Sequence, residues 1–159
     1  MKTFNKKNSQ IKLIETISLE GKKTIITGAA SGIGKATSLR LAEAGSELWL
    51  VDKNEKALEE TKKIIEALNI KIKTYIVDLS KKENIDDLWE SFDSVKPDIL
   101  INNSGIYPSK GFLEVDKNFY DEVLCVNLNS VFWMCQKFIK SRGNAGGIIV
   151  NTSSIEALV

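Results

Sequence analysis

The sequence predicts an α/β protein built on a doubly wound parallel sheet that ends after its fifth strand. Two observations support this fold class. Short apolar runs alternate along the chain with longer segments of helical periodicity, and a turn containing three glycines follows the first apolar run. Alternating strands and helices favour right-handed crossovers and therefore parallel strands. The 159 residues suffice for one domain with a substantial core.

Each predicted strand is a short apolar run bounded by polar or glycine-containing turns. The runs are residues 23–27, 47–52, 71–78, 98–102 and 146–152. The third run alternates polar with apolar residues, which is typical of a strand nearer the edge of a sheet. Because the first strand begins at Lys23, we divide the chain into an N-terminal extension, residues 1–22, and one domain, residues 23–159.

The predicted helices lie between these strands and carry apolar residues at helical spacing. They cover residues 33–44, 55–68, 81–95 and 119–141. Asn54 is the expected N-cap of the second helix. Ser80, with Glu83 three residues later, has the spacing of a capping box at the start of the third.

The composition excludes several classes of function. The formal net charge of +1 gives no electrostatic reason to expect nucleic acid or a membrane surface as a partner. No apolar run approaches the roughly 18 residues of a membrane span. The chain has no histidine and only two cysteines, so we expect no metal site. Cys125 and Cys135 would lie about 15 Å apart along one helix, too far for a disulfide, as expected of thiols in a cytoplasmic protein.

The three glycines lie in the stretch TIITGAASGIGK, residues 24–35, as Gly28, Gly32 and Gly34. In a doubly wound sheet, the turn after the first strand faces a ligand at the carboxyl edge. Glycines let the backbone approach a pyrophosphate, and a helix that begins near Ile33 supplies unpaired N–H groups. The alternative is a tight structural turn that binds no ligand. We call residues 28–34 the glycine turn.

Two other phosphate-binding motifs are excluded by the spacing. A P-loop requires a glycine five positions after Gly28, where Ile33 stands, and Lys35 is followed by Ala36 instead of serine or threonine. The G-x-G-x-x-G pattern also fails, because three residues separate Gly28 from the next glycine. A nucleoside-triphosphate hydrolase is therefore disfavoured.

The spacing T-G-x-x-x-G-x-G resembles that of the short-chain dehydrogenase/reductase family. Four further segments match the family in order: Asp78-Leu79, Asn102-Asn103-Ser104-Gly105, Asn127 in CVNLNSVF, and the serines that end GGIIVNTSS. The resemblance covers nearly all of the chain from Thr24 to Ser154. It implies that residues 23–159 form an incomplete, Rossmann-like NAD(P)-binding domain.

The resemblance implies a set of cofactor-binding residues: Gly28, Ser31, Gly32, Ile33, Gly34, Asp52, Asp78, Leu79, Asn103 and Gly105. Asp52 ends the second strand, where an acid would accept hydrogen bonds from the adenosine ribose and repel a 2′-phosphate. Ser31 stands where relatives that prefer NADP often carry a base. Both residues favour NAD over NADP, although Lys53 would offset part of the repulsion. An aspartate that only caps the next helix is the alternative.

Two catalytic residues are implied by the resemblance. Ser154, the second of two adjacent serines, matches the catalytic serine, although Ala157 replaces the glycine that usually follows. Asn127 matches an asparagine that holds a water in the proton relay, and its amide would be costly to bury without partners. The structural alternatives are turn chemistry for the asparagine-rich loop at residues 102–105 and helix capping for the serines.

The family also uses a catalytic tyrosine followed four residues later by a lysine, and this pair is missing from the chain. Tyr75, Tyr107 and Tyr120 are followed at that distance by leucine or glycine. We therefore expect an NAD(H)-dependent oxidoreductase that interconverts a small-molecule alcohol and a carbonyl, with the chain as given lacking activity. The alternative is a non-catalytic dinucleotide-binding fragment. The full-length form is expected to be a homo-oligomer.

The family fold continues beyond the fifth strand, and this has a consequence for the surface. The fifth strand would lie at a sheet edge although it has the composition of a buried strand. The long helix before it would expose an apolar patch formed by Val131, Phe132, Cys135 and Phe138.

Overall fold

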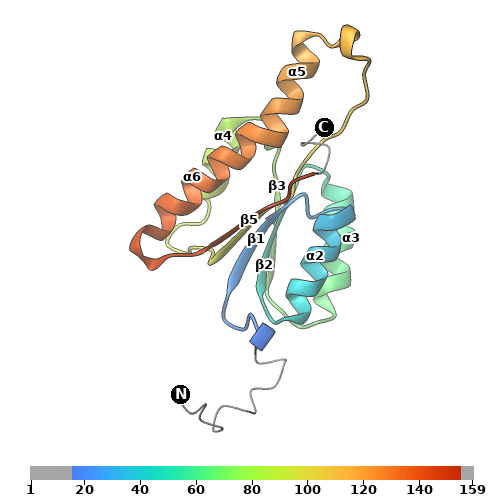
Figure 1. Ribbon diagram of the computed structural model, residues 1–159. Helices are drawn as coiled ribbons and strands as arrows, with labels where there is room; N and C mark the ends of the chain where they lie inside the picture. Colours follow the sequence, from blue (N-terminus) through green and yellow to red (C-terminus); the bar gives the residue numbers. More distant parts are fainter. Residues whose placement is uncertain (1–15, 155–159) are drawn as a thin grey trace, which may run out of the picture.

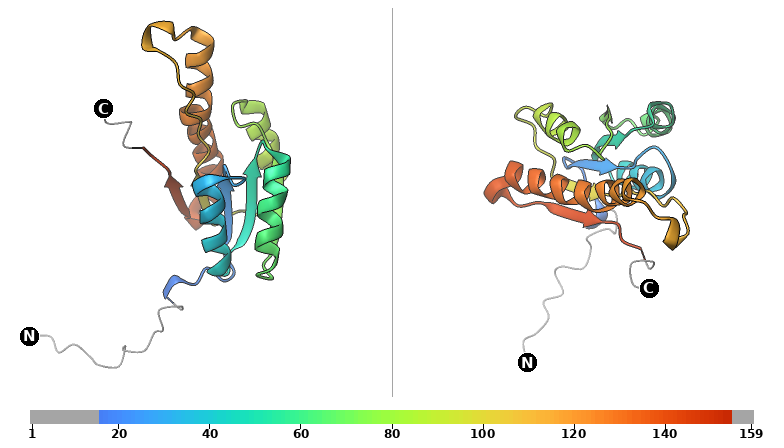
Figure 2. Two further views of the ribbon diagram at one scale, coloured as in Figure 1. Left: turned by 90° about the vertical axis from the view of Figure 1, so that its right-hand side faces the viewer. Right: turned by 90° about the horizontal axis from the view of Figure 1, so that it is seen from above.

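The computed structural model describes residues 16–154, which form a five-stranded parallel sheet with helices on both faces (Figure 1, Figure 2). The strands are β1 (Lys23–Thr27), β2 (Glu47–Asp52), β3 (Ile72–Ile76), β4 (Ile99–Asn102) and β5 (Ile148–Asn151). Their order across the sheet is β3-β2-β1-β4-β5, so the direction of winding reverses between β1 and β4. The predicted Rossmann-like, doubly wound fold is confirmed, with β3 at an edge as its alternating sequence indicated.

One face of the sheet is covered by α2 (Gly32–Glu43) and α3 (Glu55–Glu66), and the other by α4 (Lys82–Glu90) and α6 (Ser130–Arg142) (Figure 1). The helix α5 (Lys117–Leu124) extends beyond the sheet (Figure 1). A π-helical turn, Cys125–Asn129, joins α5 to α6 without a break. The Asn54 side chain accepts a hydrogen bond from the Ala57 amide at 3.1 Å and caps α3 as predicted.

The start of α4 differs from the prediction. The helix begins at Lys82, with Lys81 as its N-cap, so the capping box expected at Ser80 does not form. The Ser80 hydroxyl and amide instead donate to Oδ1 of Asp78, at 2.7 and 3.0 Å. An aspartate two residues earlier competes for these donors through a local turn, which is common chemistry for this side chain.

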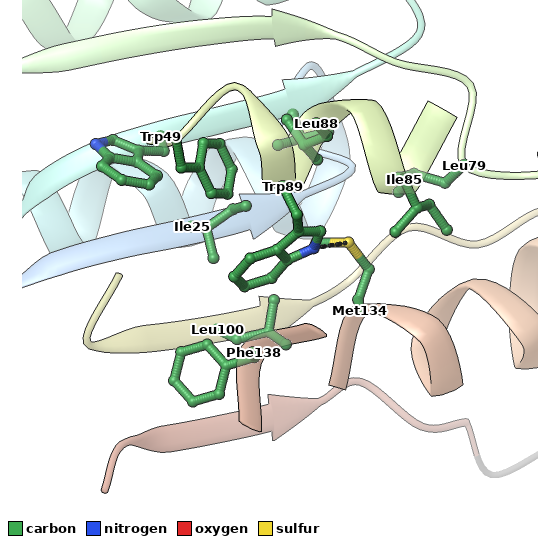
Figure 3. Close-up of a cluster of buried hydrophobic side chains, with 11 residues drawn as sticks. Ile25, Trp49, Leu79, Ile85, Leu88, Trp89, Leu100, Met134 and Phe138 are labelled. Carbon is green, nitrogen blue, oxygen red and sulfur yellow. Dashed lines mark hydrogen bonds between the residues drawn. The ribbon is translucent and has the colours of Figure 1, made fainter. Parts of the chain in front are cut away.

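Alternate residues of the strands feed two separate cores. Ile26, Leu48 and Leu50 pack under α2 and α3. Ile25, Trp49 and Leu100 face α4 and α6, where they meet an aromatic cluster (Figure 3). In that cluster the Trp89 indole N–H donates to the Met134 sulfur at 3.3 Å. This pairing of a polar tip with a buried thioether joins α4 to α6 across the sheet face.

The exposed apolar patch predicted on the long helix is only partly correct. Phe132 is 56% exposed, whereas Phe138 is 2% exposed and packs edge-on against Trp89, with ring centroids 6.3 Å apart. Phe138 points into the core because α6 turns that side of the helix toward α4 (Figure 3). On β5, Ile148 and Val150 are 56% and 46% exposed. Within residues 16–154 this strand pairs with β4 alone.

Most of the predicted N-terminal extension, and Ala157, lie outside the described residues. Between residues 16 and 154, the structure contains no helix long and apolar enough to cross a membrane.

The carboxyl ends of β1 and β4 are joined by one buried hydroxyl. Thr27, at the end of β1, is 1% exposed. Its Oγ1 accepts hydrogen bonds from the backbone amides of Asn103 and Ser104, each at 3.0 Å. Both amides follow β4, so this hydroxyl holds together the two strand ends between which the winding reverses.

Thr27→Val is expected to lower the free energy of unfolding by about 1–3 kcal/mol, because it keeps the shape of the side chain but leaves two partly buried amides without an acceptor. Urea unfolding with linear extrapolation measures the change. Thr27→Ser is the matched control, since it retains the oxygen and loses only a methyl group, at a cost of about 1 kcal/mol. An equal loss in the two variants would contradict the role given to the hydroxyl.

Candidate functional site

A cavity of about 610 Å³ opens at the carboxyl ends of the strands, where the winding reverses. Every residue predicted to bind a cofactor lines it except Gly34. The lining residues among them are Gly28, Ser31, Gly32, Ile33, Asp52, Asp78, Leu79, Asn103 and Gly105. The sheet topology therefore gathers residues that lie up to 77 positions apart in the chain, from Gly28 to Gly105, around one space.

The three glycines of the turn are required for different reasons. An added Cβ at Gly34 would lie 2.0 Å from the Gly28 carbonyl oxygen, so Gly34 lets α2 pack directly on the turn. Gly28, at φ +67°, would place a Cβ 2.9 Å from the Asn103 side chain. Gly32, at φ +51°, has no atom within 4 Å of that position. Its missing side chain leaves the cavity side of the turn open, which fits a ligand that approaches the backbone closely.

The N-terminus of α2 forms one wall of this opening. Ser31 is the N-cap, and its side chain makes no capping hydrogen bond. Ser31, Gly32 and Ile33 all line the cavity. The amides of a first helical turn lack intrahelical acceptors and carry the positive end of the helix dipole. This arrangement has the geometry and charge to hold a pyrophosphate.

Asp52 lies between the glycine turn and the start of α3. Its Oδ2 accepts a hydrogen bond from the Ala30 amide at 3.0 Å, and its Oδ1 accepts one from the Asn54 amide at 2.9 Å. Two backbone bonds fix the plane of the carboxylate at the cavity wall, next to Lys53 and Asn54. Each oxygen keeps a further lone pair for a ligand hydroxyl.

Asp78 brings a second acid to the same side of the cavity. The hydrogen bond from the Ser80 hydroxyl holds the pKa of the Asp78 carboxyl below its ordinary value; burial acts against this shift, and Lys53 and Lys81 add to it. The carboxyl is therefore charged at neutral pH. Leu79, 6% exposed, follows it as an apolar part of the wall.

The asparagines that follow β4 have different roles. Asn102 is 4% exposed and donates to Oδ1 of Asn151 at 2.9 Å, so it braces β4 against β5. Asn103 lines the cavity. Its side-chain nitrogen, Nδ2, donates to the Thr27 carbonyl at 3.3 Å and to the Gly28 carbonyl at 3.4 Å. The Thr152 hydroxyl donates to its oxygen at 3.4 Å. Asn103 thus connects the ends of β1, β4 and β5.

Asn127 is exposed, contrary to the buried position that its apolar sequence context suggested. It still satisfies both polar atoms: Oδ1 accepts from the Ile106 amide and Nδ2 donates to the Ile106 carbonyl, each at 2.8 Å. The side-chain amide therefore bonds both backbone groups of Ile106, as the backbone of a neighbouring β-strand does. It sits in the π-helical turn, a distortion frequent at functional sites, and reaches the cavity only through Ile106.

Ser154 is exposed and is not among the residues that line the cavity, although Thr152 is. Its catalytic role remains a prediction. Within the described part of the chain, no group of histidine, cysteine, aspartate or glutamate residues could hold a metal ion.

Several lining residues were not identified from the sequence as site residues: Ala30, Asn54, Ala57, Val77, Ile106, Val126 and Thr152. Most are small or apolar and have no distinctive side-chain chemistry. Thr152 is the exception, because it belongs to the matched segment that ends in Ser154. The fold brings the others to the wall through the positions of their elements.

Comparison with curated proteins links this geometry to known enzymes. A family model described as short chain dehydrogenase matches residues 22–159. The chain is 34% identical over 146 residues to 3beta-hydroxysteroid dehydrogenase 2 of Eggerthella lenta, and 36% identical over 143 residues to a 3-oxoacyl-(acyl-carrier-protein) reductase of Thermotoga maritima. The alignments cover 88% and 86% of this chain but 56% and 57% of those proteins. The chain thus spans just over half of their length.

Solved structures give the same result. L-sorbose reductase from Gluconobacter frateurii, complexed with NADPH and L-sorbose, superposes with a TM-score of 0.84 at 26% identity, over 89% of this chain and 56% of that one. NAD+-bound xylitol dehydrogenase superposes with a TM-score of 0.78 at 29% identity, over 87% and 55%. Since the family model extends over residues 22–159, the chain belongs to the short-chain dehydrogenase/reductase family of oxidoreductases.

Proposed function

We propose that this chain carries the cofactor-binding part of an NAD(H)-dependent oxidoreductase that interconverts a small-molecule alcohol and a carbonyl. One observation carries the proposal: the glycine turn is open at Gly32, beside the first amides of α2 and the carboxylate of Asp52. The φ of +51° at Gly32 would suit a tight structural turn as well, so what favours a ligand is that this open position lines the cavity beside those amides and that carboxylate. The names of the relatives, a hydroxysteroid dehydrogenase and an oxoacyl reductase, support the alcohol–carbonyl chemistry.

Eight of the residues that line the cavity have a proposed part in holding the dinucleotide. The amides at Ser31, Gly32 and Ile33 bind the pyrophosphate, for which their dipole is suited. Asp52 accepts hydrogen bonds from the adenosine ribose, and the segment Asp78-Leu79 lies along the adenine. Asn103 and Gly105 border the nicotinamide side. The bound nicotinamide supplies the hydride acceptor or donor.

The choice of NAD over NADP rests on Asp52. Its carboxylate is held in place by two backbone amides, so it cannot rotate away from a 2′-phosphate. Lys53 lines the same wall and opposes this repulsion. Relatives with each cofactor are known, as NADPH in L-sorbose reductase and NAD+ in xylitol dehydrogenase. The fixed carboxylate favours NAD.

Ser154 and Asn127 are the proposed catalytic residues on this chain. The serine hydroxyl would orient the carbonyl of the substrate, and Asn127, through its pair with Ile106, would hold a water for proton transfer. No tyrosine of the chain has a lysine four positions later. We therefore propose that these 159 residues bind cofactor without turning over substrate. A non-catalytic dinucleotide-binding fragment is the second candidate, and the same missing pair favours it.

Association of the full-length form is supported by the surface of the long helix. Leu128, Phe132 and Ile139 are 59%, 56% and 60% exposed and follow one another at helical spacing. Such a stripe of apolar side chains is typical of an interface. We propose a homo-oligomer on this ground.

NAD is expected to bind more tightly than NADP, and Asp52→Asn is expected to narrow the difference. A carboxylate held beside a phosphate should cost on the order of 1–3 kcal/mol, or roughly 5- to 150-fold in affinity. Asparagine is preferable to alanine because its oxygen can still accept from one of the two backbone amides that Asp52 holds, although its NH2 group cannot accept from the other. Calorimetric titration of both cofactors measures the ratio.

Glu55→Gln is the matched control for this titration. It removes an acid three positions along the chain that does not line the cavity. The variant should leave the NAD:NADP ratio unchanged. Equal affinities of the unaltered chain for the two cofactors would show that Asp52 does not set the preference.

The chain as given is expected to show no turnover of alcohols or ketones with NAD(H). Loss of a positioned acid–base group usually costs about 10²- to 10⁴-fold. Absorbance of NADH, followed over hours with a panel of secondary alcohols and ketones, is the measurement, and Ser154→Ala is the control. Sustained turnover that disappears in Ser154→Ala would mean that a residue of this chain replaces the tyrosine. Cofactor binding without turnover is the expected result.

A further inference from the structure

The glycine turn is held from outside by a series of hydrogen bonds that fall on consecutive peptide groups. The Ala29 amide donates to the Val51 carbonyl at 3.2 Å. The Ala30 amide donates to Asp52 at 3.0 Å. On the next peptide group, the Ala30 carbonyl accepts from the Thr61 hydroxyl at 3.3 Å. The first two acceptors belong to β2, whereas Thr61 lies in the middle of α3.

The bond from Thr61 has a geometric consequence on the opposite side of the turn. The Ala30 carbonyl and the Ser31 amide belong to the same planar peptide group, and the chain from residue 16 to 154 has no cis peptide bond. In a trans peptide, the N–H points away from the C=O. A carbonyl directed at Thr61 therefore directs the Ser31 N–H away from α3. Ser31 lines the cavity, and its amide donates to no other described residue.

Thr61 is buried at a position where a hydroxyl without a hydrogen-bond partner would be costly. The side chain is 1% exposed, and Leu58 and Ile65, on the same side of α3, belong to the apolar core. Its single hydroxyl proton is shared with the Ala57 carbonyl, 3.1 Å away and one turn earlier in α3. That local bond is common for threonine in helices and gives the helix little stability. The bond to Ala30 is the one that connects α3 to the glycine turn.

We propose that Thr61 is a positioning residue for the cofactor: by holding the Ala30 carbonyl, it aims the Ser31 amide into the cavity. The proposal rests on the proposed function, in which that amide binds the pyrophosphate. Asp52 fixes the preceding peptide group in the same way. The two side chains together orient the turn just before the open position at Gly32.

The test compares Thr61→Val with Thr61→Ser in the full 159-residue chain. Valine keeps the shape and removes the hydroxyl, whereas serine keeps the hydroxyl and removes a methyl group. The first measurement is the chemical shift of the Ser31 amide, by nuclear magnetic resonance without cofactor. The second is the affinity for NAD. Urea unfolding of each variant shows how much global stability has changed, and Thr61→Ala is the second hydroxyl-free variant if Thr61→Val does not fold.

Thr61→Val is expected to shift the Ser31 signal and to weaken NAD binding roughly 2- to 10-fold, the range of one hydrogen bond. Thr61→Ser is expected to restore both readouts. A purely structural threonine would change stability while leaving the Ser31 signal and the NAD affinity of the folded chain unaltered, and that result would overturn the proposal. So would a Thr61→Ser variant that behaves like Thr61→Val.

The cofactor-free measurement separates this proposal from the proposed function. If the unaltered chain binds neither NAD nor NADP, the proposed function fails. The Ser31 signal still decides whether Thr61 positions the turn: a shift in Thr61→Val that Thr61→Ser reverses supports the positioning, and an unmoved signal overturns it.

Discussion

The close contact between the first turn of α2 and the end of β1 is the constraint on which the site depends. A Cβ atom at Gly34 would lie 2.0 Å from the Gly28 carbonyl oxygen, so any side chain there would push the helix away from the strand. Because the helix lies this close, its N-terminal amides reach the point where the winding of the sheet reverses. That point is where doubly wound sheets bind ligands. The contact thus places these amides at the cavity where we propose that the cofactor binds.

The polar side chains around this contact mostly hold backbone groups. Thr27 accepts from two amides after β4, and Asn127 pairs with both backbone atoms of Ile106. Asp52 holds the turn itself through the Ala30 amide. Backbone groups at the cavity are therefore positioned by side chains. Because Asp52 both holds the turn and is the residue proposed to select the cofactor, a substitution there would alter the turn as well as the charge.

The helices α4 and α6, on the face of the sheet opposite α2 and α3, hold Asn127 and the loop after β4 in place. The aromatic cluster around Trp89 joins α4 to α6 through Met134 and Phe138 (Figure 3). An ion pair between Asp86 and Lys137, at 2.7 Å, adds a second link between the same helices. With α6 anchored to the core, the π-helical turn at its start carries Asn127 to the loop after β4. The core thus determines where the Asn127 amide meets Ile106.

The sequence alone determined the order of strands and helices, because hydrophobic periodicity and turn residues are local properties. The strands at Lys23–Thr27 and Glu47–Asp52 and the Asn54 cap followed from it, whereas the expected cavity residues came from the resemblance to a known family. Local competition and packing decided the rest. The Ser80 hydroxyl donates to Asp78 instead of forming the expected capping box. Phe138 is buried because its side of α6 faces the core. Thr61 stood out in no pattern, because its significance depends on a carbonyl 31 positions away that only the packing of α3 against the glycine turn brings within reach.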